Sequence, residues 1–287
     1  MQERNEYPPG VPCWVDSGQP DPEAAAEFYG GLFGWQMEER MPAEAPGHYI
    51  TASLEGREVA AVGSLPPNVP QQAAWNTYVC VASADESARR VTEAGGTVLM
   101  EPFDVFEAGR MAYVTDPAGA AFAVWQPNQM IGARIVNEPG SWNWSDLRTT
   151  DPEGAKEFYA AVFGWEATTI DVGAGTTTLW RAPGYGDFLE NTVDPEIRKR
   201  QEEVGAPPGF EDAIAWLSPL ESTTTPEAAA HWHVTFSVAD ADATAAHAAE
   251  LGGAVAVEPN DIPWSRIAVL RDPQGAAFTI SEFQPPE

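Results

Sequence analysis

The sequence has few basic residues and almost no cysteine. Lys and Arg number 15 against 43 Asp and Glu, which gives a formal net charge of −28 over 287 residues. Such a chain repels phosphate backbones and anionic membranes, so we expect neither a nucleic acid nor a membrane as a partner. The two cysteines, Cys13 and Cys80, are too few for a disulfide scaffold and lack the spacing of a metal-binding pair. We therefore predict buried, reduced thiols.

Long apolar runs are missing as well. No stretch approaches the roughly 20 apolar residues of a membrane-spanning helix. Residues 1–10 carry charges and prolines where a signal peptide is apolar, so we expect a cytoplasmic location. The patterns GxGxxG, GxxxxGK[ST] and GxSxG do not occur in a fitting context, which argues against nucleotide chemistry and serine hydrolysis.

The chain does contain an internal repeat. Residues 21–35 (DPEAAAEFYGGLFGW) and 151–165 (DPEGAKEFYAAVFGW) are identical at ten of fifteen positions, at an offset of 130. Residues 116–122 (DPAGAAF) and 272–278 (DPQGAAF) repeat at an offset of 156, so the second half carries about 26 extra residues (156 − 130). We predict two domains, 1–130 and 140–287, with an insertion at about 183–212 in the second.

Each half divides again into two modules of one pattern. In the first module a strand at 11–17 precedes a helix that Asp21, Pro22 and an early Glu23 open and Gly34 closes. Strands at 36–40, 49–54 and 58–65 follow, and the other quarters repeat this βαβββ order. A single module is too small to bury its own sheet. We therefore predict an α+β fold in which four βαβββ modules pair into two cup-shaped mixed-sheet domains.

The repeated motifs resemble those of the vicinal oxygen chelate superfamily, which includes glyoxalase I, extradiol dioxygenases and bleomycin- and fosfomycin-resistance proteins. The resemblance is carried by FYGGLFGW and FYAAVFGW, by EAGG and ELGG, and by DPAGAAF and DPQGAAF, and it is closest to two-domain, four-module bacterial members. It implies small-molecule cups, but it implies no single activity, because this fold hosts isomerases, dioxygenases, transferases, hydrolases and drug-binding proteins.

The resemblance also implies where metal ligands would lie. Metal-binding members take His or Gln from the first strand of each module and Glu from a final strand. Counting from the shared motifs gives these positions in this chain as Trp14, Asn76 and Ala123 in the first cup and Trp144, His233 and Thr279 in the second. One imidazole does not make a metal site, so we expect no metal and no other cofactor. A makeshift site formed by Asp16 or Asp146 with His233 remains the alternative.

The side chains predicted to face the cups combine aromatic walls with a few polar groups, as small-molecule pockets do. The predicted substrate-binding residues are Trp14, Asp16, Asn76, Tyr78, Trp125, Trp144, Thr235, Thr279 and, from the insertion, Tyr185. Two alternatives stay open. Trp14 and Trp144, at the implied metal positions, fill the cavities instead of contacting a ligand. Alternatively, Asp16 and Asp146 are structural and are held by a neighbour such as Arg148.

His233 is the candidate catalytic residue, because imidazole is the usual group for proton transfer near neutral pH. Asp146 across the cup is the predicted partner that orients it. The alternative is a buried histidine that lines the pocket without chemistry.

Three functions follow from these patterns. The first is a metal-independent enzyme that moves protons on a small organic molecule, as an isomerase, cyclase or lyase. The second is a binding or resistance protein that sequesters an aromatic compound, neutral or cationic. The third is a metal-dependent glyoxalase or dioxygenase. A monomer would suffice for two complete cups, and a homodimer remains open. The insertion is either a lid or a packing element between domains.

Overall fold

The computed structural model describes residues 3–65, 72–171, 176–220 and 229–285. The first domain contains β1 (Pro12–Gln19), α1 (Pro22–Phe33), β2 (Gln36–Glu39), β3 (Tyr49–Leu54), β4 (Arg57–Ser64), β5 (Ala74–Cys80), α2 (Ala84–Glu93), β6 (Thr97–Val105), β7 (Gly109–Thr115) and β8 (Ala121–Pro127). The second domain contains β9 (Trp142–Thr149), α3 (Pro152–Phe163), β10 (Glu166–Asp171), β11 (Thr176–Arg181), α4 (Tyr185–Thr192), α5 (Ile197–Glu203), the 3-10 helix η1 (Phe210–Asp212), β12 (Ala213–Pro219), β13 (His231–Ser237), α6 (Ala241–Glu250), β14 (Ala254–Ile262), β15 (Ser265–Arg271) and β16 (Ala277–Phe283).

Each domain is built on one mixed sheet of eight strands, in the order β2-β3-β4-β1-β5-β8-β7-β6 and β10-β11-β12-β9-β13-β16-β15-β14. Two modules meet in the middle of each sheet, where β1 pairs antiparallel with β5 and β9 with β13. The predicted α+β fold of four βαβββ modules is confirmed. The segment predicted as an insertion, at about 183–212, contains the two short helices α4 and α5 and the 3-10 helix η1.

The first helix of each domain begins and ends where its sequence indicates. Asp21 caps α1 by accepting a hydrogen bond from the Ala24 N–H, and Asp151 caps α3 in the same way. A proline occupies the first turn of both helices, where its missing N–H leaves no bond unmade. Gly34 and Gly164 end the helices in the left-handed conformation that favours glycine.

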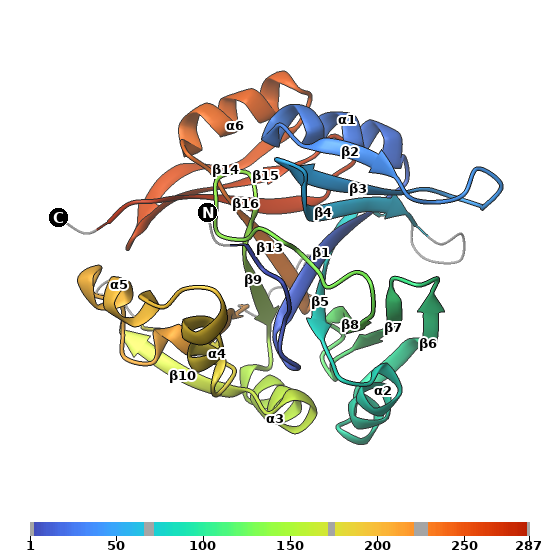
Figure 1. Ribbon diagram of the computed structural model, residues 1–287. Helices are drawn as coiled ribbons and strands as arrows, with labels where there is room; N and C mark the ends of the chain where they lie inside the picture. The colour runs from blue at the N-terminus through green and yellow to red at the C-terminus, as the bar shows by residue number, and fades with distance from the viewer. Residues whose placement is uncertain (1–2, 66–71, 172–175, 221–228, 286–287) are drawn as a thin grey trace.

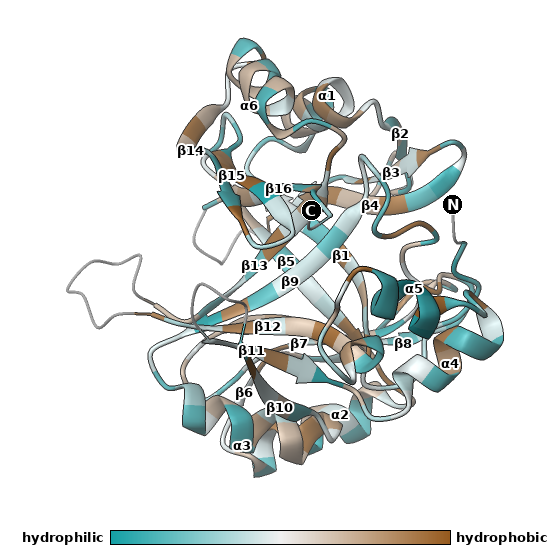
Figure 2. Ribbon diagram, turned by 90° about the vertical axis from the view of Figure 1, so that its left-hand side faces the viewer, coloured by the Kyte–Doolittle hydropathy of each residue, from teal (hydrophilic) through white to brown (hydrophobic). Residues whose placement is uncertain are grey.

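The two sheets lie back to back, with α1 beside α6 at one end of the molecule and α2 beside α3 at the other (Figure 1, Figure 2). At the centre Thr77 of β5 and Ser145 of β9 share a hydrogen bond of 2.7 Å between their hydroxyls. The concave faces of the sheets therefore point away from each other, and each domain has its own cup. No helix of the described residues is both long and apolar enough to cross a membrane.

The repeated motifs form the contact between the domains. Tyr29 of α1 donates to the Asp272 carboxylate of the other domain at 2.9 Å and accepts from the Trp75 indole at 2.9 Å. The second domain makes the same contact in the opposite direction with Tyr159, Asp116 and Trp232.

The other motif residues join the same interface. The indoles of Trp35 and Trp165 donate, both at 2.6 Å, to the carbonyls of Gly140 and Gly10, which lie just before the first strand of the opposite domain. The motifs that repeat most clearly thus hold the domains together and do not line the cups. Cys13 and Cys80 are buried and free, as predicted.

Candidate functional site

The strand register brings the predicted cup residues together in equivalent pairs. Asp16 lies directly opposite Asn76 across β1 and β5, and Asp146 lies opposite His233 across β9 and β13. Directly opposed residues share one face of a sheet. In the final strands, Ala123 pairs with Tyr78 and Thr279 with Thr235. Both cups therefore offer the same positions with different side chains.

In the first cup these positions are occupied by a closed hydrogen-bond network. The buried Asp16 carboxylate accepts from the hydroxyl of Tyr78 at 2.5 Å and from the Asn76 amide at 2.8 Å. Tyr49 donates to the same carboxylate at 3.2 Å and accepts from the buried Trp14 indole at 3.0 Å. Three of the predicted ligand-binding residues of this cup, Asp16, Asn76 and Tyr78, thus bind one another.

Two tyrosines that were not predicted from the sequence complete the hydrogen-bond network of the first cup. Besides Tyr49, Tyr113 of β7 donates to the Asn76 side-chain carbonyl at 2.7 Å. Burial raises the pKa of Asp16, although its three donors oppose that shift. Burial and the nearby Asp16 raise the pKa of Tyr113 to about 12. The Trp125 indole also has an internal partner, the Met130 carbonyl at 2.9 Å.

The second cup has an incomplete network. His233 is 4% exposed, and its Nε2 lies 2.8 Å from the Thr279 hydroxyl. Asp146 accepts from the Arg148 guanidinium at Oδ2, at 2.9 Å. Its other oxygen, Oδ1, is buried and has no hydrogen-bond partner among the described residues. His233 and Asp146 are opposed on adjacent strands, but within this part of the chain no hydrogen bond joins them.

The surroundings of His233 favour its neutral form. Burial lowers its pKa well below the ordinary 6.5, and the positive charges of Arg148, His231 and Arg271 lower it further. A neutral imidazole has one donor and one acceptor nitrogen, so His233 carries a lone pair that can act as a base toward a bound ligand.

This pKa shift predicts a pH dependence of stability. Below pH 6.5 His233 is protonated in the unfolded chain but stays neutral in the folded protein. The free energy of unfolding therefore decreases as the pH falls below 6.5. Urea unfolding at about pH 7 and about pH 5 should show that wild type loses up to about 1.4 kcal/mol per pH unit relative to His233→Gln. His247→Gln, which changes an exposed ring, is the control. Equal pH slopes in wild type and His233→Gln would contradict the prediction.

The second cup has an aromatic wall to which the insertion contributes. Trp144 packs against Trp216 of β12 at 5.5 Å and against Phe210 of η1 at 5.9 Å between ring centroids. Neither Trp216 nor the contact of Phe210 with Trp144 was predicted from the sequence. Tyr185, predicted as a ligand contact, is only partly buried and lies beside Arg4 of the N-terminal segment.

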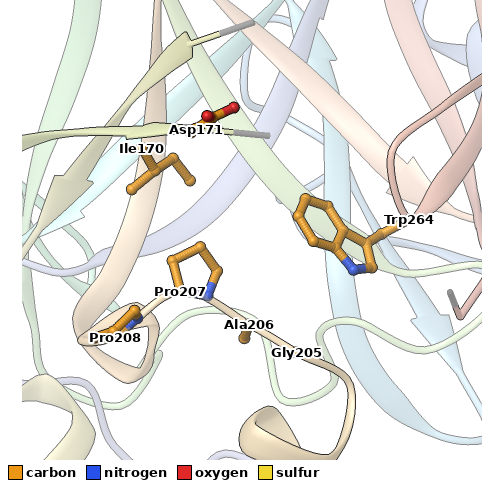
Figure 3. A pocket seen from close by; sticks show the side chains of 7 residues that line it. All are labelled: Ile170, Asp171, Gly205, Ala206, Pro207, Pro208 and Trp264. Carbon is orange, nitrogen blue, oxygen red and sulfur yellow. The ribbon is translucent and has the colours of Figure 1, made fainter. Parts of the chain in front are cut away.

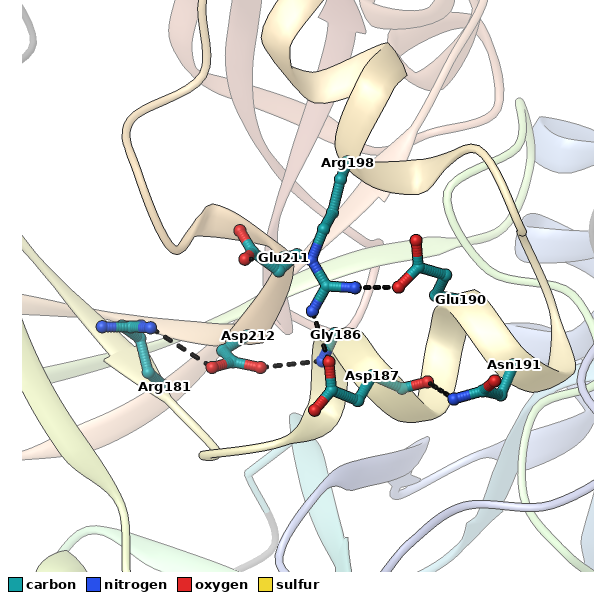
Figure 4. A network of polar contacts seen from close by, with 8 residues as sticks. All are labelled: Arg181, Gly186, Asp187, Glu190, Asn191, Arg198, Glu211 and Asp212. Atoms are coloured by element: carbon teal, nitrogen blue, oxygen red, sulfur yellow. Dashed lines mark hydrogen bonds and ion pairs between the residues drawn. The ribbon is translucent and has the colours of Figure 1, made fainter.

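Ion pairs hold the insertion in place (Figure 4). Arg198 of α5 is bonded to Asp187 and Glu190 of α4, and it also pairs with Glu211. Asp212 accepts from the Gly186 N–H at 2.7 Å and from Arg181 of β11 at 3.2 Å. The segment between α5 and η1 is therefore fixed at both ends relative to the second sheet.

Away from the buried polar groups, exposed apolar side chains lie on the concave faces of both sheets. Val257 of β14 is 47% exposed and lies in one cross-strand row with Val269 and Thr279. In the first domain the exposed Met100 lies opposite Tyr113 in the same way. Exposed apolar side chains that line a concave surface are typical of a binding site for apolar ligands.

The residues at the implied metal positions do not make a metal-binding set. The first cup offers an indole, an amide and a methyl group, and the second an indole, an imidazole and a hydroxyl. Within the described ranges, no three His, Cys, Asp or Glu side chains gather closely enough to hold a metal ion.

Comparisons with known proteins agree with this architecture. The sequence matches the model of the Glyoxalase/Bleomycin resistance protein/Dioxygenase superfamily over residues 14–124 and 141–280. "Putative glyoxylase CFP32" of Mycobacterium tuberculosis (strain CDC 1551 / Oshkosh) is 40% identical over 289 residues, 99% of both chains. "Anthracycline biosynthesis protein DauV" of Streptomyces sp. (strain C5) is 37% identical over 291 residues, 97% of this chain and 95% of that protein. The Mn(II)-bound glyoxalase from Novosphingobium aromaticivorans has a TM-score of 0.58 at 13% identity, over 98% of this chain and 83% of that one, a likeness of fold alone.

Proposed function

Because the chain belongs to the Glyoxalase/Bleomycin resistance protein/Dioxygenase superfamily, we propose that it acts on a small organic molecule in its second cup. In this proposal His233 transfers a proton on the bound molecule, Asp146 orients and stabilises the imidazole, and no metal ion takes part. The first cup supplies structure and, at its apolar rim, a further surface for ligands.

The difference between the two cups carries this proposal. Both carboxylate oxygens of Asp16 accept hydrogen bonds, whereas the buried Asp146 Oδ1 has no donor among the described residues. A buried carboxylate oxygen without a donor is costly and calls for an explanation. Rotation of the opposed His233 ring toward Asp146 supplies the donor, and the adjacent carboxylate then favours the imidazolium.

The chemistry needs only proton movement. The neutral His233 takes a proton from an acidic C–H or O–H of the ligand, and the resulting imidazolium returns it at another atom. Isomerisation, cyclisation and elimination all balance in this way without an oxidant or reductant. The aromatic wall of Trp144, Trp216 and Phe210 favours a ligand that contains a ring.

The experiment compares wild type with His233→Gln, which preserves the size of the side chain. Aromatic polyketides are the first candidate substrates, because DauV is named for anthracycline biosynthesis. We expect His233→Gln to lower turnover about 100-fold or more while ligand affinity changes little, since general acid–base catalysis contributes about 10²–10⁴ in rate. His247→Gln is the control. Unchanged turnover in His233→Gln would reject the catalytic assignment.

The exposed apolar faces favour a second candidate function, the sequestering of an aromatic molecule. Binding without turnover in wild type would support it. A standard glyoxalase assay with and without manganese tests for a metal-dependent activity. Activity that appears only with the metal would overturn the metal-free proposal.

A further inference from the structure

A groove beside the second cup has no part in the proton transfer proposed above. It has a volume of about 590 Å³, within the range of small-molecule sites. As Figure 3 shows, its lining comes from three segments. Ile170 and Asp171 belong to β10, residues 205–208 belong to the insertion, and Trp264 lies in the turn between β14 and β15.

The groove spans the mouth of the second cup. β10 and β14 are the two opposite edges of the second sheet, and the groove touches β10 and the turn that follows β14. Asp146 lies opposite Trp216, which lies opposite Leu179, and Leu179 lies opposite Thr168. Ile170, two residues beyond Thr168, therefore projects from the same concave face as Asp146.

The walls of the groove are flat and offer few hydrogen-bond donors. The Trp264 indole lies on one side, and the rings of Pro207 and Pro208 lie on the other (Figure 3). Prolines have no N–H, and the N–H groups of Gly205 and Ala206 are already bonded within the insertion. Such walls recognise an apolar face better than a polar group.

Trp264 is held in this position at a conformational cost. Its backbone has φ = 62°, in the left-handed region that bulky residues rarely adopt. Its carbonyl accepts a 2.8 Å hydrogen bond from the Gln284 N–H, which fixes the turn. Backbone strain of this kind persists where the surrounding structure imposes it, and it is concentrated at functional sites.

The apolar surface continues from Trp264 along the sheet. Ile262 and Phe283 are 44% and 58% exposed, and both lie opposite Ser265. On the other side, Phe210 connects the groove segment to the cup, because it follows Pro208 by two residues and packs on Trp144.

We propose that the groove binds a planar fused-ring aromatic part of the substrate, stacked on Trp264, that is neutral or cationic. The inference rests on the proposed function, because the same molecule extends from the cup into the groove. The net charge of −28 disfavours an anionic ligand.

The test measures the binding of three probes by fluorescence and calorimetry. They are the three-ring cation 9-aminoacridine, the three-ring anion anthraquinone-2-sulfonate and the one-ring phenol. We expect 9-aminoacridine to bind more tightly than the anion, and Trp264→Ala to weaken its binding about 10-fold, because the ligand loses its stacking contact with the indole. Trp264→Phe should restore most of the loss, and phenol affinity should be the same in all three proteins.

The possible results distinguish ligand stacking in the groove from proton transfer in the cup. Equal affinity of wild type and Trp264→Ala for 9-aminoacridine would reject the proposed stacking site in the groove. Tighter binding of the anion than of the cation would also reject it. A parallel loss of phenol binding also overturns it, because the substitution would then act through the whole cup. If Trp264-dependent binding persists while His233→Gln leaves turnover unchanged, the proposed function fails and the stacking site stands.

Discussion

Asp272→Ala is expected to destabilise the protein by about 3–5 kcal/mol. The buried Asp272 carboxylate accepts from the side chains of Gln19 and Tyr29 in the first domain and from the backbone N–H groups of Gln274 and Ala276 in its own turn. Alanine leaves several buried donors unpaired, each at a cost of about 1–3 kcal/mol. Urea unfolding at neutral pH measures the effect.

The matched control is the equivalent residue of the other domain. Asp116 accepts from the Ala120 N–H at 2.8 Å, but from Tyr159 only at 3.4 Å, and a threonine, Thr149, stands where the first domain has Gln19. Asp116→Ala should therefore cost roughly half as much as Asp272→Ala. A loss for Asp272→Ala below about 1 kcal/mol would show that the crossed contacts do not stabilise the interface.

Gly96→Ala is the second substitution with a large expected effect. A methyl group at Gly96 would lie 2.4 Å from the Thr115 carbonyl oxygen and 2.9 Å from the Phe158 ring of the other domain. Neither a strand carbonyl nor a buried ring gives way easily, so we expect a loss of about 3 kcal/mol or more. Calorimetric unfolding should show it directly.

Its neighbour provides the comparison. Gly95 has φ = 89°, and a methyl group there would meet no atom closer than Pro117 at 3.8 Å. Gly95→Ala should thus cost about 1–2 kcal/mol, the strain of the left-handed backbone alone. If the two variants were equally stable, close packing between the domains would not be the reason for the second glycine of this motif.

The sequence predicts the fold well because the fold depends on local signals repeated along the chain. Asp21 and Gly34 mark the ends of a helix without reference to any distant residue, and the same marks recur at Asp151 and Gly164. What the motifs contact was not predictable in this way. The Tyr29–Asp272 bond joins residues 243 positions apart, and no periodicity records such a pairing.

The candidate site was predictable only in part. The register places Asp146 opposite His233; counting from the shared motifs names His233, and Asp146 lies two residues beyond the counted Trp144. Tyr49 and Tyr113 were missed because their contacts depend on how β3 and β7 align with distant strands, which a single sequence does not specify. Trp216 and Phe210 were missed for a related reason, since the path of an insertion is set by tertiary contacts such as Arg198 with Asp187.

The crossed contacts join the two domains at sites outside the segment that connects them. The two halves meet through matching surfaces, each tyrosine reaching the aspartate of the other half, as subunits of a two-fold symmetric dimer do. The segment around Gly140 contacts both halves, since Gly140 bonds Trp35 and Ser237, and the covalent link raises the effective concentration of each half for the other to about the millimolar range. One fused chain also lets the two cups diverge, because a change such as Asn76 in one and His233 in the other alters one site at a time.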